Sequence, residues 1–303
     1  MKGPTGSEYI HGMLTRNIAI DGSFDLKRTV RTLGVGRFDD EGCWWWATRT
    51  SEGLATLAVE ATAEGVTAHA WGPGADEILE SVPRLIAADD DYSIGTVNQP
   101  MRDILARARG LRLGSTGDVH EAIVTAVLGQ VVTKTEGKRS LRSIKRAFGV
   151  AAPGPSAMAS VFPSPDVLAG LSYDDLHGHG VERKRAATVI EVSRRSKRLE
   201  EILTMNAEDA RSRLLAVRGI GEWTTGIVMG QAYGDRDALP IGDYHLPNMV
   251  SWALAGEPRG DDDRMVELLE PYRPYRRHAL IAIKQAGISA PKYGPRTDVR
   301  HHL

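Results

Sequence analysis

The strongest constraint on the fold is a change of residue pattern at about residue 110. Before it, the runs 54–61 (LATLAVEA) and 66–72 (VTAHAWG) read as extended segments joined by a short turn. After it, apolar residues recur at helical spacing, interrupted by glycine and proline. The stretch 109–118 (RGLRLGSTGD) between the two patterns is rich in chain-breaking residues. We therefore predict an α+β domain over residues 1–108 and an all-helical domain over residues 109–303.

The first domain is expected to hold an antiparallel sheet. Its predicted elements are strands over 16–21, 44–50, 54–61 and 66–72, and a helix capped by Ser23 and ended by Gly34. In the second domain, helical spacing predicts helices over 119–133, 138–148, 166–171, 182–198, 207–216, 222–233, 246–254, 264–271 and 275–286.

Composition excludes several classes of site. Cys43 is the single cysteine of the 303 residues, which excludes an internal disulfide framework, a four-cysteine zinc site and a four-cysteine iron–sulfur cluster. Without a long apolar run or a signal-peptide pattern at the start, we expect a cytoplasmic protein that does not bind membranes. Residues 101–200 hold 17 Lys and Arg against 10 Asp and Glu, which fits either a polyanion-binding face or solvated helix faces.

One stretch, from Leu215 to Pro247, carries most of the functional signal. The turn Arg218-Gly219-Ile220-Gly221 separates two helical segments, so its glycines allow a sharp hairpin with exposed amides. Backbone amides at a helix start bind phosphate oxygens without reading base sequence. The alternative is a plain αα-hairpin with no ligand.

Several segments together resemble a known superfamily. The residues 214–226 (LLAVRGIGEWTTG) resemble the helix-hairpin-helix motif of DNA glycosylases. In chain order, further resemblances to that superfamily lie at 126–132 (AVLGQVV), 179–190 (HGVERKRAATVI), 240–250 (PIGDYHLPNMV) and 272–283 (YRPYRRHALIAI). The last resembles the closing helix of 3-methyladenine DNA glycosylase II.

The resemblance implies two helical lobes with an active-site cleft between them, and a role for specific residues. It implies a catalytic aspartate, Asp243; a base pocket of Trp223, Tyr244 and Tyr275; a DNA-backbone hairpin with Arg218, Gly219, Gly221 and Thr224; and a wedge at Val131, helped by Gln130. A carboxylate beside the anomeric carbon stabilises the positive charge that develops when an N-glycosidic bond breaks. The alternative roles are a helix N-cap for Asp243, core packing for the aromatic residues and a buried helix position for Val131.

The expected activity is hydrolysis of the N-glycosidic bond of alkylated purines, of the 3-methyladenine and 7-methylguanine type, in bacterial base excision repair. Trp223 stands where bifunctional members carry a Schiff-base lysine, so the resemblance implies a monofunctional enzyme without lyase activity. We expect no organic cofactor and no side-chain metal site, although hairpin carbonyls could hold a monovalent cation. The expected partner of this monomer is double-stranded DNA with a damaged base in the nucleoid. Alternatives are a non-catalytic protein that binds distorted DNA and a glycosylase for deaminated or oxidised bases.

Overall fold

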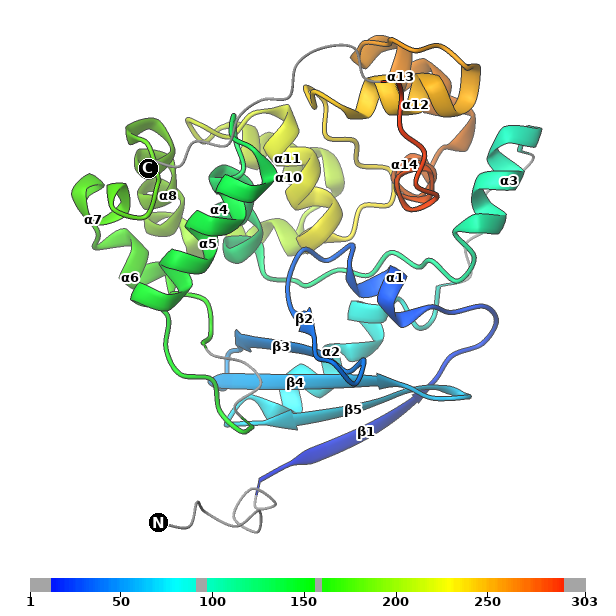
Figure 1. Ribbon diagram of the computed structural model, residues 1–303. Helices are drawn as coiled ribbons and strands as arrows, with labels where there is room; N and C mark the ends of the chain where they lie inside the picture. Colours follow the sequence, from blue (N-terminus) through cyan, green and yellow to red (C-terminus); the bar gives the residue numbers. More distant parts are fainter. Residues whose placement is uncertain (1–11, 91–96, 156–159, 292–303) are drawn as a thin grey trace.

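The computed structural model describes residues 12–90, 97–155 and 160–291. An N-terminal antiparallel sheet is followed by a larger, entirely helical part (Figure 1). The predicted fold class, an α+β domain followed by an all-helical core, is therefore confirmed. Within the described residues, no helix has both the length and the apolar character that would let it cross a membrane.

The sheet has the strand order β1-β5-β4-β3-β2, and each neighbouring pair is antiparallel. Its strands are β1 (Leu14–Ala19), β2 (Arg37–Phe38), β3 (Trp44–Arg49), β4 (Leu54–Ala61) and β5 (Gly65–Trp71). Its core combines strand residues with the buried face of α2 (Ala75–Ile86), which includes Ile78, Val82 and Leu85. Alternation along β4 and β5 supplies the side chains that this helix covers.

Two helices of this domain differ from the prediction. Helix α1 (Leu26–Val30) begins after Ser23, because Asp25 is its N-cap and accepts the backbone N–H of Arg28 at 2.8 Å. Helix α2 was not predicted at all, although its apolar residues share one face. Pro83 lies inside α2, and a proline in that position is normally read as the end of a helix.

The helical part is built from helices of 5 to 15 residues. They are α3 (Gln99–Arg107), α4 (Val119–Leu128), α5 (Lys134–Phe148), α6 (Pro165–Ala169), α7 (Tyr173–His177), α8 (Arg183–Arg194), α9 (Ser196–Glu200), α10 (Ala207–Leu215), α11 (Glu222–Val228), α12 (Leu246–Ala255), α13 (Asp262–Leu269) and α14 (Arg276–Gln285). Short 3-10 or π segments are η1 (Glu201–Thr204), η2 (Met229–Tyr233) and η3 (Glu270–Tyr272). The expected helix over 119–133 is wrong at its end, because α4 stops at Leu128 and Gly129 caps it.

The helices form two lobes with separate cores. The first core includes Val127, Val189 and Leu214, from α4, α8 and α10, and the second includes Val250 and Leu280, from α12 and α14. Helix α3 contributes to the second core and contacts α14, although it precedes the predicted boundary. The division of the chain at residue 108 stays a prediction.

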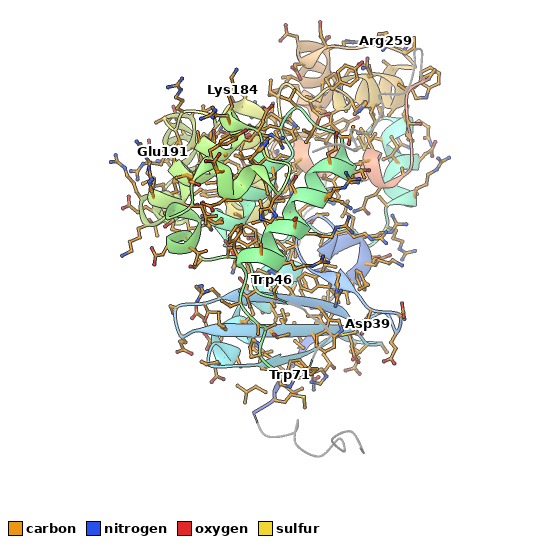
Figure 2. The ribbon with its side chains drawn as sticks, turned by 60° about the vertical axis from the view of Figure 1, so that its left-hand side comes forward. Asp39, Trp46, Trp71, Lys184, Glu191 and Arg259 are labelled. Atoms are coloured by element: carbon orange, nitrogen blue, oxygen red, sulfur yellow. The ribbon has the colours of Figure 1, made fainter. Side chains whose placement is uncertain are left out.

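Buried carboxyl groups lie where α4 meets the sheet, close to the position of Trp46 in Figure 2. The side chain of Glu121 is 4% exposed, and its nearest cation is Lys145 at 3.6 Å. Burial raises the pKa of Glu121 to about 7; Lys145 opposes this rise, and the neighbouring Asp118 adds to it. The protonated form of Glu121 is therefore favoured by folding.

A raised carboxyl pKa makes the protein less stable as pH rises through that pKa, because the unfolded chain ionises more easily. Between about pH 5 and about pH 8.5, we expect the parent to lose about 3 kcal/mol of unfolding free energy relative to Glu121→Gln. Urea denaturation of both proteins across this range measures the difference. Glu208→Gln, at an exposed glutamate of α10, is the control and should follow the parent. Parallel curves for the parent and Glu121→Gln would contradict the prediction.

Candidate active site

The glycine turn forms a hairpin between α10 and α11, as the sequence predicts. Ile220 is 5% exposed and fills the space between the helices, and its N–H donates to the carbonyl of Val217 at 3.0 Å. Gly219 has a φ of +94°, which favours glycine. Arg218, Gly219 and Gly221 are exposed, so this turn presents backbone to the surroundings.

The two glycines of the hairpin should tolerate substitution differently. A Cβ on Gly219 would lie 2.1 Å from Oγ1 of Thr188, whereas a Cβ on Gly221 would meet nothing within 4 Å. We expect Gly219→Ala to lose about 1–3 kcal/mol of unfolding free energy and to bind duplex DNA more weakly. Gly221→Ala is the matched control and should retain its stability. Equal melting temperatures for the two variants would show that the turn is not constrained in this way.

Asp243 lies in the turn before α12 and is held by three hydrogen bonds. Its Oδ1 accepts the backbone N–H of His245 at 2.8 Å and that of Leu246 at 3.0 Å. Its Oδ2 accepts the indole N–H of Trp223 at 2.9 Å. The side chain is half-buried, so the carboxylate remains reachable from solvent. It therefore satisfies amides at the start of α12, as an N-cap does, and it also faces the hairpin helix.

Val131 is at the tip of the segment that joins α4 to α5. Its side chain is 100% exposed and its φ is +54°. The alternative of a buried helix position is therefore wrong, because the helix has ended at Gly129. Gln130, next to it, donates through Nε2 to the carbonyl of Gly219 at 3.0 Å and to Oγ1 of Thr224 at 2.8 Å.

A cavity of about 670 Å³ brings most of these residues together. Its lining includes Val131, Trp223, Thr224, Asp243 and Tyr244, and it continues between α5 and the start of α8. The cavity thus lies where the first helical lobe meets the loop that leads into the second. A carboxylate, an indole and an exposed apolar tip share one opening.

Three of the expected site residues do not lie as their expected roles suggest. Thr224 is 1% exposed and its hydroxyl binds Gln130, so it supports the hairpin from inside rather than offering its hydroxyl to DNA. Gln130 is bonded to the hairpin rather than extended beside Val131. Tyr275, the residue before α14, is not among the residues that line the cavity, whereas Tyr244 lines it and is 83% exposed.

Positive charge lies within electrostatic range of the Asp243 carboxylate, and sequence reasoning missed part of it. Partial burial lowers the pKa of Lys284, on α14; the nearby charge of Lys134 lowers it further, and the carboxylate of Asp243 raises it. The two lysines and Asp243 therefore lie within electrostatic range of one another. Neither lysine is among the residues that line the cavity, so their charge acts on Asp243 from outside it. Lys284 directly follows the segment 272–283, but that resemblance does not indicate that its side chain comes near Asp243.

The described residues contain no group of three or more His, Cys, Asp or Glu side chains arranged to hold a metal ion. At the hairpin, the Val217 carbonyl already accepts the N–H of Ile220, and the Gly219 carbonyl accepts Nε2 of Gln130. Two carbonyls that a monovalent cation could use are thus engaged in hydrogen bonds.

Comparisons with known proteins agree with this fold. No protein-family model matches the chain. The DNA-3-methyladenine glycosylase of Bacillus subtilis is 24% identical over 212 residues, which cover 67% of this chain and 70% of that protein. The solved 3-methyladenine DNA glycosylase of Archaeoglobus fulgidus is 17% identical, with a TM-score of 0.77 over 88% of this chain and 96% of that chain. The apo 8-oxoguanine glycosylase/lyase of Clostridium acetobutylicum is 14% identical, with a TM-score of 0.70 over 91% and 96%. The two structural similarities show a shared fold.

Proposed function

We propose that this chain, which belongs to the helix-hairpin-helix DNA glycosylase superfamily and is of the 3-methyladenine DNA glycosylase II type, hydrolyses the N-glycosidic bond of alkylated purines in DNA. The observation that carries the proposal is the hydrogen-bonded carboxylate of Asp243 in one cavity with Trp223 and Val131. The B. subtilis relative, named for 3-methyladenine, supports the choice of substrate class.

Asp243 is the proposed catalytic residue. The bond to the base breaks with positive charge on the sugar, and a negative carboxylate beside the anomeric carbon stabilises that charge. Water supplies the oxygen that replaces the base, so the products are a free purine and an abasic site. Three hydrogen bonds fix the carboxylate before the substrate arrives, which lowers the reorganisation needed in the transition state.

The aromatic side chains of the cavity suit a cationic base. N-alkylated purines carry positive charge, and each aromatic face attracts a cation by about 0.5–2 kcal/mol. Trp223 and Tyr244 line the cavity, and Tyr244 is exposed enough to contact a base that has left the duplex. The role of Tyr275 as a residue of the base pocket stays a prediction. Val131 is the proposed wedge that fills the space left by the extruded nucleotide.

The proposed enzyme is monofunctional. A lyase needs an amine that attacks the sugar carbon, and the hairpin holds Trp223 where such an amine would stand. The hairpin amides and the exposed Arg218 would contact the phosphate backbone of double-stranded DNA, so binding should weaken as salt increases. We also expect the enzyme to be a monomer that acts on the nucleoid in the cytoplasm. Both expectations stay predictions.

A panel of duplex oligonucleotides, each with a single defined lesion, tests the proposed function. We expect release of 7-methylguanine and strand breakage only after alkali treatment. The C. acetobutylicum neighbour is named for 8-oxoguanine, so this base belongs in the panel together with hypoxanthine and uracil. If 8-oxoguanine were the single base released, the proposed substrate class would be wrong. Strand breakage without alkali would show lyase activity. Binding without release of any base would favour the non-catalytic alternative.

A further inference from the structure

The segment that joins α4 to α5 holds Val131 in a conformation that the segment would not adopt alone. A β-branched residue rarely occupies the left-handed region, and here it has a φ of +54°. Apolar burial does not offset this backbone strain, because the side chain of Val131 is 100% exposed. A strained, exposed apolar residue persists only where its surroundings fix the backbone, and such strain is typical of functional segments.

Gln130 fixes the segment to the hairpin. Its Nε2 donates to the Gly219 carbonyl at 3.0 Å and to the Thr224 hydroxyl at 2.8 Å. Thr224 is 1% exposed and belongs to α11, so one end of this connection is in the protein interior. The backbone next to Val131 is thereby tied to the element proposed to grip the DNA strand.

Arg185 fixes the other side of the same segment. Its Nη1 donates to the Leu128 carbonyl at 2.9 Å, and its Nη2 donates to the Gly180 carbonyl at 3.3 Å. Leu128 is the last residue of α4, where carbonyls lack helical partners and a positive charge is favourable. The side chain of Arg185 is 4% exposed, and its charge is kept in the interior through these contacts and an ion pair of its Nε with Glu182 at 3.8 Å.

We propose that Gln130 and Arg185 are positioning residues that hold Val131 ready to enter the base stack when the damaged nucleotide rotates out. The inference rests on the proposed function, since only a base-paired lesion requires its stack to be opened. With both side chains in place, the Val131 backbone is already ordered before DNA binds. Without them, the segment relaxes to a common conformation and must be ordered during insertion, which weakens the extruded state.

The test compares one lesion in two settings. Single-turnover release of 7-methylguanine is measured from a fully paired duplex and from the same oligonucleotide as a single strand. For Gln130→Leu and Arg185→Met, we expect the duplex rate to fall about tenfold or more, since the hydrogen bonds of Gln130 to the hairpin or the charge-assisted hydrogen bonds of Arg185 are lost. The single-strand rate should stay within about twofold, because no stack has to be opened. Arg185→Lys, which keeps the charge and a donor, should recover part of the duplex rate.

Lys184→Met is the matched control. Lys184 is the exposed neighbour of Arg185 on α8 (Figure 2), so this variant removes a cation without touching the α4 end. It should change the duplex and single-strand rates by the same factor. Equal losses on both substrates for Gln130→Leu and Arg185→Met, or no loss on either, would overturn the positioning role. If Arg185→Met does not fold, the comparison is made with Gln130→Leu, because Gln130 is partly exposed and its replacement should not prevent folding.

A second readout separates this inference from the proposed function. The fluorescence of 2-aminopurine placed beside an abasic-site analogue reports insertion of Val131 even if no base is ever released. The parent and Lys184→Met should raise the fluorescence on binding, and Gln130→Leu and Arg185→Met should raise it less. A parent that releases no base from either substrate refutes the proposed reaction. An equal fluorescence rise in all the proteins refutes the positioning role instead.

Discussion

Replacing Asp243 by Asn is expected to lower the rate of base release by about 10³-fold, because an amide cannot stabilise the positive charge on the sugar. The fold should persist, since Asn is as good a capping residue as Asp and its amide oxygen can accept the N–H groups of His245 and Leu246. The hydrogen bond from the Trp223 indole is lost, because the amide NH2 group that replaces Oδ2 is itself a donor. Single-turnover release of 7-methylguanine measures the loss. Binding to the damaged duplex should change little, because the glycine turn and Arg218 are unchanged.

The matched control is the same substitution at Asp261. This aspartate also caps a helix, accepting the N–H of Arg264 at 2.9 Å, but it does not line the cavity. Asp261→Asn should release 7-methylguanine as fast as the parent, with a similar melting temperature. If Asp243→Asn were as fast as the parent, the carboxylate would be only a helix cap and the reaction would need another residue.

Val131→Gly is expected to lower release from a paired duplex by about 10–100-fold, because an inserted valine loses about 1.5–3 kcal/mol of apolar burial when it is removed. Stability should be equal or slightly higher, since glycine adopts a φ of +54° without strain. Activity and stability are therefore expected to change in opposite directions. Release assays combined with thermal unfolding measure both.

Val167→Ala is the control for this variant, since it shortens a valine that is 39% exposed on α6, outside the cavity. It should leave release unchanged. A Val131→Gly variant that releases base from the duplex at the parent rate would show that another side chain fills the space, or that the nucleotide is not extruded here.

Periodicity predicted most of the fold, because it reports which face of an element is buried. The strand 54–61 and the helix pair around the glycine turn lie where the pattern places them. Helix α2 was missed although its apolar residues share one face, because Pro83 lies inside it and a proline is normally read as the end of a helix. The end of α4 was misplaced because Val131 and Val132 continue an apolar run, although the chain has left the helix at Gly129.

The candidate site could be predicted only in part. Motif order pointed to Trp223 and Asp243, and the structure joins them by a hydrogen bond. The contacts of Gln130 could not be predicted, because they link residues that are 89 and 94 positions apart in the chain. Arg185 lies in the segment 179–190, which resembles the superfamily, so a signal was present. Its hydrogen bond to the Leu128 carbonyl could not be predicted, because that contact depends on where α4 ends.

The contact between β3 and the start of α4 bears on how far this protein can be shortened. The Thr48 hydroxyl donates to one oxygen of Asp118 at 3.2 Å, and the other oxygen caps α4 by accepting the N–H of Glu121 at 2.8 Å. The far end of that helix leads to Val131. In a fragment lacking the strands, the start of α4 would therefore be exposed to water. The segment at its far end, which carries Val131, would lose part of its support. The sheet domain would thus support the segment that carries the proposed wedge.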